Sequence, residues 1–350
     1  MQTYRIDPIQ DHRWEQFLQT HPGASVFHTP AWLNALRGTY EYEPVAFTTS
    51  APTRPITNGL VFCRVQSWLT GSRLVSVPFA DHCRPLFDTS EDGNSLAAFL
   101  PELLEQEHCD YVEVRFPTSE ALIPALNGLT QSAAFLHHTL DLRPPLSALF
   151  DRLHKSCFQR RIRRAEKERL TYAEGTGDSL LRQFYSLLVL TRRRHGVPPQ
   201  PLAWFLNLRS WFGDAIKFGV ASKNGRPIAS MLTLQFKGTV VYKYGCSDAA
   251  FHRFGAMPFL FWQTIQRAKA DGASEFDLGR SDIDDEGLIA FKNHLGAAGT
   301  PLTYYRFPAA SAAPAGLGGF IQQHRISAVS TRLPSVLLRA AGNFLYRHIG

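Results

Sequence analysis

The chain has 350 residues, enough for two domains of ordinary size. Hydrophobic residues make up 44% of it and charged residues 19%, a balance that excludes an intrinsically disordered protein. The net charge of +7 favours anionic partners such as nucleic acid, nucleotides, phosphates or an acidic membrane surface, and charge alone does not choose among them.

Cysteine usage and apolar runs exclude further classes of protein. The five cysteines are scattered without a Cys-x-x-Cys pair, which argues against a disulfide framework and against a zinc site. The first ten residues, MQTYRIDPIQ, lack the apolar stretch of a signal peptide. No run approaches the ~18 apolar residues of a membrane-spanning helix. We therefore expect a cytoplasmic protein with no metal and no tightly bound cofactor.

The first part of the chain predicts a mixed α/β domain. Pro30 fits the start of a helix, where its missing N–H costs nothing. The expected helices are 11–20, 30–38, 95–107 and 119–127. The expected strands are 44–49, 59–66, 73–77, 111–116 and 134–142. The sequence Arg143-Pro144-Pro145 then predicts a domain boundary.

The second part predicts the same order of helices and strands. The turn from Lys223 to Arg226 contains Asn-Gly, a strong hairpin signal. The expected helices are 158–169, 178–195, 201–212 and 258–271, with one more after residue 286. The expected strands are 215–222, 227–236, 239–246, 275–278 and 302–307. This architectural repeat predicts an α/β (α+β) fold of two related mixed-sheet domains, residues 1–145 and 146–308.

Residues 309–350 are expected to form a linker and a basic, amphipathic helical tail. Its arginines recur at intervals of seven, among apolar residues. Such a tail, over residues 320–349, can rest on an anionic membrane surface. Docking onto the protein itself or onto a second subunit is the alternative.

The stretch 276–296, FDLGRSDIDDEGLIAFKNHLG, predicts a strand, a polar turn and a helix. Leu288, Phe291 and Leu295 share one helical face, and Lys292 projects inside that arc, where a solvated lysine is not expected. A cation aimed inward is a candidate for chemistry. Alternatively, this lysine snorkels from the helix margin or pairs with an aspartate of the turn.

The acidic turn that precedes this helix admits two interpretations. Its Asp282-x-Asp284-x-Glu286-Gly287 pattern is similar to the start of an EF-hand loop. The twelfth position is Asn293 in place of the bidentate glutamate, and a strand precedes the turn where an EF-hand has a helix. Acidic residues that cap the next helix are therefore the better explanation.

The expected helix 158–169 is strongly basic. Four residues at i, i+3, i+4 and i+7 share one of its faces: Arg160, Arg163, Arg164 and Lys167. Phe158, Ile162 and Ala165 occupy the opposite face and are expected to pack on the domain. A cationic ridge of this kind suits a phosphate-rich partner, such as tRNA or a nucleotide-linked precursor. A solvated surface is the alternative.

Six spaced motifs add a family resemblance. They are FHTPAWLNAL, VPFADHCRPL, KSCFQRRIRRAEKERL, TRRRHGVPPQP, VVYKYGCSD and FDLGRS…GLIAFKNHLG. In this order they resemble the FemAB-like, or BioF2-like, branch of the GNAT acyltransferase superfamily, over residues 10–308. The resemblance implies two tandem GNAT-like domains with a cleft between them. It also implies transfer of an activated acyl group to an amine, from aminoacyl-tRNA in some members; other members are encoded with exopolysaccharide or exosortase systems.

The resemblance also implies roles for single residues. It places Lys292 on a lysine proposed to stabilise charge on the acyl carbonyl, a role suited to a fixed cation in a dry site. Asp277 and Tyr244 are candidates to orient the amine or relay a proton, and either can instead be a packing residue. The implied substrate contacts, each with structural packing or capping as its alternative, are Arg194, Arg280, Asp81 and Trp32.

The donor stays open between acyl-CoA and aminoacyl-tRNA. GNAT enzymes that use acetyl-CoA carry an R/Q-x-x-G-x-G/A loop whose N–H groups bind pyrophosphate at a helix start. Residues 252–258 read HRFGAMP, and this altered spacing weighs against CoA. We expect an N-acyltransferase that acts on an amine of a cell-envelope or polysaccharide-related acceptor. The alternative is a non-enzymatic basic assembly factor that binds RNA or membranes.

Overall fold

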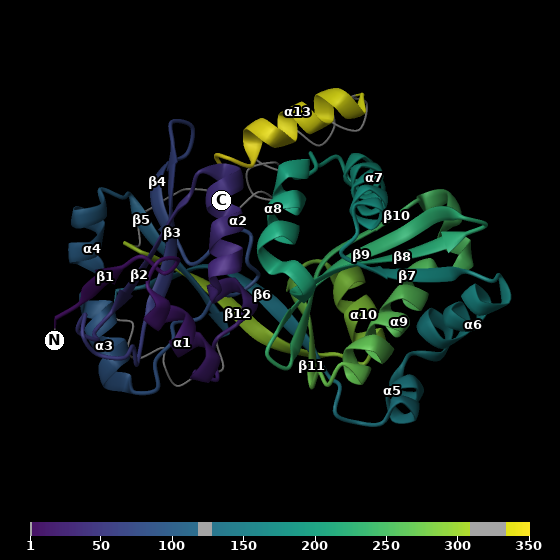
Figure 1. Cartoon of the computed structure of the whole chain (residues 1–350), viewed down its shortest axis with the longest axis horizontal. Helices are drawn as coiled ribbons and strands as arrows, with labels where there is room; N and C mark the ends of the chain where they lie inside the picture. The colour runs from purple at the N-terminus through teal and green to yellow at the C-terminus, as the bar shows by residue number, and fades with distance from the viewer. Residues whose placement is uncertain (1, 118–127, 309–333) are drawn as a thin grey trace. The chain divides into compact units, whose positions relative to one another are not determined.

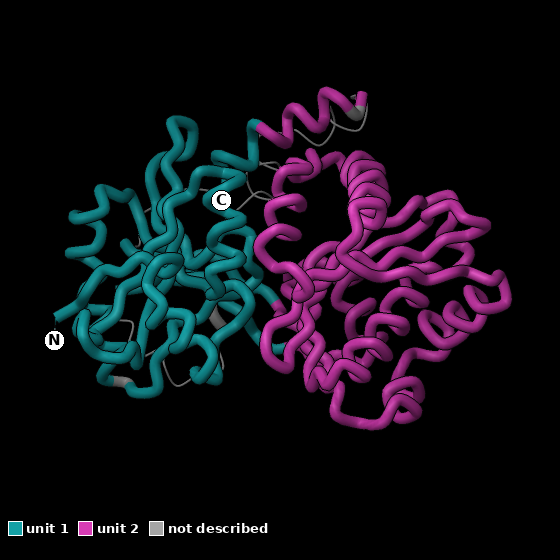
Figure 2. The backbone as a smooth tube through the Cα atoms, in the orientation of Figure 1, with its two compact units in different colours: residues 1–135, 300–324, 344–350 teal, residues 136–299, 325–343 magenta. Residues whose placement is uncertain are grey.

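A computed structural model describes residues 2–117, 128–308 and 334–350. The chain forms two compact units, coloured separately in Figure 2. Unit 1 comprises Met1–Phe135, Thr300–His324 and Phe344–Gly350, and unit 2 comprises Leu136–Gly299 and Arg325–Asn343. Each unit combines a mixed sheet with helices, so the predicted α/β class is confirmed.

The sheet of unit 1 is mostly antiparallel (Figure 1). Its strands are β1 (Tyr4–Ile6), β2 (Glu43–Thr48), β3 (Leu60–Ser67), β4 (Gly71–Val75), β5 (Tyr111–Pro117) and β12 (Ala298–Phe307), in the order β1-β2-β3-β4-β5-β12. Strands β4 and β5 are parallel, whereas β12 runs antiparallel to β5 with Tyr304 opposite Arg115. A segment from late in the chain therefore completes the sheet of the first unit.

In unit 1, local signals start α1 and α2 close to where the sequence predicts. The helices are α1 (His12–Thr20), the 3-10 turn η1 (Val26–His28), α2 (Pro30–Tyr40), α3 (Ser90–Ala98) and α4 (Leu100–Glu107). Thr29 caps α2 by accepting a hydrogen bond from the Trp32 N–H, and Pro30 stands in the first turn. Helices α3 and α4 contribute Leu96, Leu100 and Leu103 to the core over β2, β3 and β5.

Unit 2 is built around the remaining strands of the sheet, which are of mixed direction. Its strands are β6 (Thr130–Asp141), β11 (Glu275–Asp282), β10 (Thr239–Ser247), β9 (Arg226–Phe236), β8 (Ile216–Lys223) and β7 (Thr171–Gly175), in the order β6-β11-β10-β9-β8-β7. Strands β8 and β9 form the predicted hairpin, with Asn224 and Gly225 at positive φ in its turn. Strands β10 and β11 run parallel to each other.

Helices cover both faces of this sheet. They are α5 (Leu146–Arg152), the π-helical turn η3 (Lys155–Gln159), α6 (Arg160–Lys167), α7 (Asp178–Arg194), α8 (Leu202–Phe212), the 3-10 turns η4 (Gly213–Ala215) and η5 (Ala249–Phe254), α9 (Ala256–Ala270) and α10 (Glu286–His294). In Figure 1, α7 and α8 lie on one side of β8–β10, and α9 and α10 lie on the other. The core on the second side joins Phe158 and Ile162 to residues of α9 and β11.

Several predicted elements differ in their limits. The helix expected at 95–107 is two helices, since Pro101 interrupts the main-chain ladder and starts α4. The helix expected at 158–169 begins earlier as η3 and continues as α6. The helix expected at 119–127 lies outside the described residues, as do residues 309–333 of the tail. The described part of the tail holds α13 (Ser335–Leu345).

The compact units also depart from the predicted ranges. Residues 136–145 lie in unit 2, and residues 300–308 lie in unit 1 because β12 pairs with β5. The boundaries of independently folding domains stay a prediction. None of the helices in the described ranges is long and apolar enough to span a bilayer.

Candidate active site

The parallel strands β10 and β11 pair over a short distance and then part. Their register runs from Thr239 opposite Glu275 to Val241 opposite Asp277, and β10 shifts register between Tyr242 and Tyr244. Beyond this point β10 leads through η5 into α9, and β11 leads into α10. Ligands of α/β proteins bind at the carboxyl ends of parallel strands that separate in this way.

A cavity of about 470 Å³ lies at this position in unit 2, at the start of α9. Its polar lining is Cys157, Arg161, Ser247, Asp248, His252 and His294. Apolar side chains of β9, η5, α9 and α10 supply the rest, among them Ile228, Phe251 and Phe291. An apolar cavity with a few polar groups in its lining is the usual form of a small-molecule site.

Ser247 and His252 form a fixed polar pair in the wall of this cavity. The Ser247 Oγ lies 2.9 Å from His252 Nε2. The Ser247 main chain is held by Thr191, whose Oγ1 accepts from the amide at 2.9 Å and donates to the carbonyl at 3.1 Å. Burial lowers the pKa of His252, and the nearby Arg194 lowers it further, while Asp248 acts in the opposite direction.

The beginning of α9 is shaped by Gly255. This residue has a φ of +75°, and a Cβ there would lie 2.4 Å from the carbonyl oxygen of Arg161. The glycine therefore lets α6 pack directly on the first turn of α9, which brings Arg161 into the cavity wall. The N–H groups of this first turn carry the positive end of the helix dipole.

Lys292 lies at a second position, between α10 and β11. It is 3% exposed, and its Nζ donates to the carbonyl oxygens of Gly279 at 2.9 Å and Arg280 at 2.8 Å. The predicted inward direction is therefore correct, whereas the predicted stripe is partly wrong because Leu288 is 36% exposed. The buried side of α10 consists of Lys292 and, just beyond the helix, Leu295.

Asp277 is buried in β11, close in sequence to Gly279 and Arg280, whose carbonyls bind Lys292. Its Oδ1 accepts from the Gly279 N–H at 2.7 Å and lies 2.8 Å from Nε2 of His137 in β6. We call His137, Asp277 and Lys292 the β11 cluster. The neighbouring His138 is fully buried, and burial together with the charge of Lys292 lowers its pKa.

The structure separates the β11 cluster from the cavity lining. Helix α10 faces the cavity with Gly287, Ala290, Phe291 and His294, and Lys292 is not among these residues. The turn before α10 is a cap, as expected, because Asp285 accepts from the Leu288 N–H at 2.9 Å.

Tyr244, the third candidate for catalysis, lies elsewhere in unit 2. Its hydroxyl accepts a hydrogen bond from Trp204 Nε1 at 2.9 Å, and its ring packs against Phe205 at 5.2 Å. The sequence cannot show that α8 covers this face of β10. The structure thus places Tyr244 within an aromatic core, away from the cavity lining.

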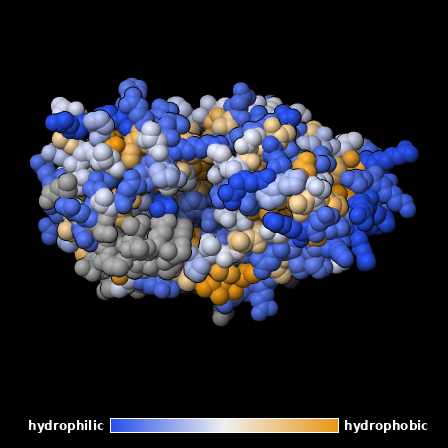
Figure 3. All heavy atoms as spheres, turned by 90° about the horizontal axis from the view of Figure 1, so that it is seen from below, coloured by the Kyte–Doolittle hydropathy of each residue, from blue (hydrophilic) through white to orange (hydrophobic). Residues whose placement is uncertain are grey.

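The basic ridge is exposed at all four of its predicted residues: Arg160, Arg163, Arg164 and Lys167. The opposite face of α6 is buried. The strongly hydrophilic surface at the right of Figure 3 is the end of unit 2 where α5 and α6 lie in Figure 1. Arg164 pairs with Glu168 at 2.8 Å, so acidic residues partly relieve the ridge. The cavity residue is Arg161, which the four-residue pattern passes over.

Arg194 and Arg280 occupy different settings. Arg194 is exposed at the end of α7, and its Nη1 donates to the Ser247 carbonyl at 3.3 Å. It thereby supports the polar lining of the cavity. Arg280 is half-buried in β11, and its carbonyl holds Lys292.

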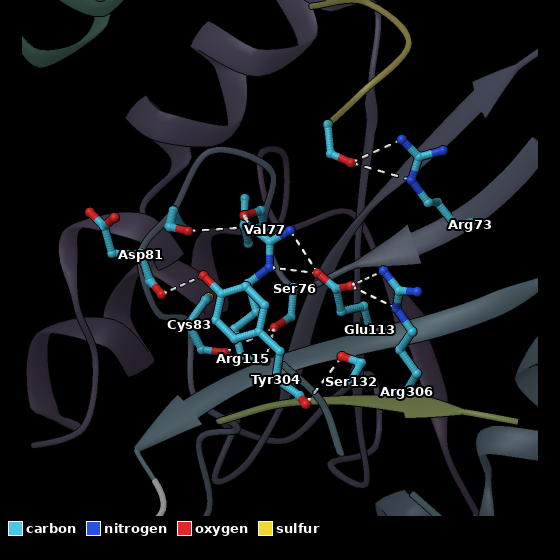
Figure 4. Close-up of polar contacts among 12 residues, drawn as sticks. Arg73, Ser76, Val77, Asp81, Cys83, Glu113, Arg115, Ser132, Tyr304 and Arg306 are labelled. Atoms are coloured by element: carbon cyan, nitrogen blue, oxygen red, sulfur yellow. Dashed lines mark hydrogen bonds and ion pairs between the residues drawn. The ribbon is translucent and has the colours of Figure 1, made fainter. Parts of the chain in front are cut away.

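In unit 1, Asp81 stands in a loop that buried charges hold in place (Figure 4). Tyr304 donates its hydroxyl hydrogen to the Asp81 carbonyl at 2.8 Å. Arg115 donates to the carbonyls of Val77 and Ala80, each at 3.2 Å. These main-chain contacts fix the backbone of the loop that carries Asp81.

The same network contains a buried carboxylate between two arginines. Glu113 contacts Arg115 at 2.7 Å and Arg306 at 2.9 Å. Burial acts to raise the pKa of Glu113, but the two guanidinium groups outweigh it and hold the pKa below its usual value. Trp32, predicted as a contact residue, is fully buried against Phe27 and packs in the core of unit 1.

One group of metal-ligating side chains adjoins the cavity. The ligand atoms of His154, Cys157 and His294 lie within 4.8 Å of one another. The His154 Nδ1, however, accepts a hydrogen bond from the Cys157 N–H at 3.2 Å. Its proton is then on Nε2, so neither ring nitrogen offers a free lone pair, which works against a metal at this position.

Comparisons with known proteins now identify the class. Residues 154–292, which include Lys292 and the cavity lining apart from His294, match the family described as "Acetyltransferase (GNAT) domain". Residues 154–292 therefore have the character of a GNAT acetyltransferase domain. A search of curated protein sequences finds no match.

Solved structures extend the likeness to most of the chain. FemX is similar with a TM-score of 0.68 and 13% identity, over 88% of this chain and 97% of that chain. A tandem GNAT protein from the clavulanic acid biosynthesis pathway has a TM-score of 0.55 and 12% identity, over 89% of this chain and 99% of that chain. L-PGS from Bacillus licheniformis has a TM-score of 0.53 and 13% identity, over 93% of this chain and 96% of that chain. The predicted tandem GNAT-like fold is confirmed, and the FemX likeness agrees with the predicted FemAB-like branch.

Proposed function

We propose that the chain is an N-acyltransferase that moves an acyl or aminoacyl group from a phosphate-bearing donor to an amine of a cell-envelope or polysaccharide-related acceptor. The observation that carries this proposal is the cavity at the start of α9 within the GNAT domain. A helix start, Arg161, Asp248 and two histidines line it together with apolar residues.

The two kinds of lining in the cavity suit the two parts of an activated acyl donor. The first-turn N–H groups of α9 and the guanidinium of Arg161 are suited to bind phosphate groups. The apolar part suits an acyl chain or the arm that carries it. Acyl-CoA and aminoacyl-tRNA both have this composition, and the exposed ridge of α6 adds a surface that only the larger donor reaches.

In the proposed reaction, the amine nitrogen attacks the carbonyl carbon of the donor. The carbon–sulfur or carbon–oxygen bond to the carrier breaks, and the amine loses one proton. We assign to Lys292 the stabilisation of negative charge on the carbonyl oxygen. Because its buried ammonium group is held by two main-chain carbonyls outside the cavity lining, this assignment requires the acyl carbonyl to extend from the cavity toward β11. Asp277 orients the acceptor amine, and Tyr244 has a packing role.

Binding measurements on two neighbouring arginines test this function. Arg161→Glu removes the cavity cation and should weaken acyl-CoA binding by about tenfold or more, because a charged hydrogen bond to phosphate becomes a repulsion. Arg163→Glu changes the same charge on the exposed ridge and is the matched control. With acyl-CoA as the donor, only the first change should weaken binding.

The same pair of variants distinguishes the donors. With charged tRNA, both variants should bind more weakly, because both positions then contact phosphates, and the affinity of each should depend less steeply on salt. If neither donor binds the parent chain, the proposed function fails. Binding of uncharged RNA without any transfer would instead favour the non-enzymatic alternative.

A further inference from the structure

Ser247 and His252 form a side-chain pair that takes no part in the chemical step proposed above. The Ser247 Oγ lies 2.9 Å from His252 Nε2, and both residues line the cavity of unit 2. Ser247 is only 8% exposed, whereas His252 is exposed. A hydroxyl within hydrogen-bond distance of an imidazole is the arrangement in which serine becomes a nucleophile, because the imidazole takes its proton.

Main-chain contacts fix the position of Ser247 at the end of β10. Its amide donates to Thr191 Oγ1 at 2.9 Å. Its carbonyl accepts from Thr191 Oγ1 at 3.1 Å and from Arg194 Nη1 at 3.3 Å. These contacts tie the end of the strand to α7, so the hydroxyl is held beside the imidazole by the backbone, and its own hydrogen bond stays available for proton transfer.

The imidazole is placed by the 3-10 turn η5. Asp248 caps this turn by accepting from the Ala250 N–H at 3.1 Å, and the His252 carbonyl accepts from the Gly255 N–H at 3.2 Å. Partial burial is the main reason that the pKa of His252 lies below the usual histidine value, so the unprotonated ring, which accepts a proton, prevails at pH 8. The negative charge of Asp248 acts the other way and stabilises the ring once it is protonated.

The rest of the cavity lining suits an acyl ester. The first-turn N–H groups of α9 have no acceptor within their own helix, and such groups stabilise a carbonyl oxygen that becomes negative. Ile228, Phe251 and Phe291 supply apolar surface for the acyl chain. Because His252 is exposed, water from the solvent reaches the imidazole and is available as the second reactant.

We propose that Ser247 and His252 hydrolyse small carboxylic esters with an apolar acyl group, as a second activity of this cavity. The Ser247 Oγ attacks the carbonyl carbon of the ester while its proton passes to His252 Nε2. The bond from that carbon to the alcohol oxygen breaks, and the alcohol leaves with this proton. Water then attacks the acyl-serine, again with His252 as the base, which releases the carboxylic acid and restores the hydroxyl. This hydrolysis needs neither the phosphate-bearing donor nor the amine of the proposed function.

A fluorophosphonate probe and p-nitrophenyl butyrate test this activity on the full chain at pH 8. The parent should carry the probe on Ser247, located by peptide mass spectrometry, and should hydrolyse the ester faster than buffer alone. Ser247→Ala should lose the label and about a hundredfold or more of kcat/KM, because no nucleophile remains. His252→Gln should lose both to a similar extent, because the amide accepts no proton. Circular dichroism checks that each variant is folded.

A second serine–histidine pair provides the matched control. In unit 1 the Ser25 Oγ lies 2.9 Å from His28 Nδ1, the same distance as in the cavity pair. His28, however, is fully buried, and its Nε2 lies 3.0 Å from the Arg84 carbonyl oxygen. Ser25→Ala should therefore leave both the labelling of Ser247 and the ester hydrolysis unchanged.

The outcomes decide the proposal without reference to amine transfer. A parent chain that takes no label would overturn it, as would equal ester hydrolysis by the parent and Ser247→Ala. Equal labelling of Ser25 and Ser247 would also overturn it, because any serine beside a histidine would then react. Neither assay contains a phosphate-bearing donor or an amine acceptor, so a failure of the proposed function would leave these results as they are.

Discussion

The carbonyl oxygen of Arg161 occupies the space that a side chain at position 255 would need. Gly255 has a φ of +75°, and its missing Cβ lets the main chain of α6 approach the start of α9. The cavity wall depends on this close approach, because Arg161 reaches the cavity from that turn of α6. A single glycine thus sets the position of a cation one helix away.

Two glycine variants separate the contact from the backbone angle. Gly225→Ala, at a φ of +76° with open space around it, should cost about 1–2 kcal/mol of unfolding free energy. Gly255→Ala has nearly the same angle and an added clash, so it should cost about 1–3 kcal/mol more. Urea denaturation of both variants measures the difference. Equal losses would show that the α6–α9 approach is not tight.

Lys292 is the residue on which the proposed chemistry depends. Lys292→Met should lower turnover by about a hundredfold or more, as when one oxyanion donor is removed. It should also cost about 1–3 kcal/mol of stability, because the carbonyls of Gly279 and Arg280 lose their donor. Turnover is therefore compared with the folded fraction, followed by circular dichroism at the assay temperature. A folded variant with normal turnover would contradict the assignment.

Single residues also show where sequence reasoning ends. The 3.6-residue period places Lys292 on the inner side of its helix, and the structure confirms that direction. The same reasoning selects Arg160 and three other residues of α6 because they share a face, and passes over Arg161. Only the contact between α6 and Gly255 reveals that Arg161 reaches a cavity, and no local pattern contains that contact.

The helices and strands around the cavity are predicted correctly in type, but their limits differ from the predicted ones. The predicted helix 158–169 begins as the π-helical turn η3, which places Cys157 in the cavity wall. The strands β10 and β11 are predicted, but the point at which they part depends on pairing between segments 36 residues apart in the chain. Periodicity reports which face of an element is buried, and pairing between distant segments decides where a cavity opens.

For the whole chain, too, local patterns do not show which distant segments pair. Strand β12 completes the sheet of unit 1, although the sequence order places it with the second domain. Its Arg306 supplies one of the two guanidinium groups that balance the buried Glu113. The sequence predicts a strand at 302–307, and nothing local indicates that its partner is β5.

A fragment tests what this pairing contributes. Residues 1–145 alone lack β12, so the β5 edge is open and Glu113 has one arginine fewer. We expect no cooperative urea transition for this fragment, and a transition once a peptide of residues 298–308 is added. Circular dichroism follows both. A cooperative transition of the fragment alone would support the predicted boundary at residue 145 instead.

The late position of β12 has a consequence for synthesis. A ribosome makes β5 long before it makes β12, so the nascent first unit holds a carboxylate and an open strand edge while the GNAT domain is still being translated. The first unit to be made is then the last to close. During that interval the nascent chain has its greatest need for a chaperone, and a stop of translation before residue 306 would leave an incomplete protein in both units.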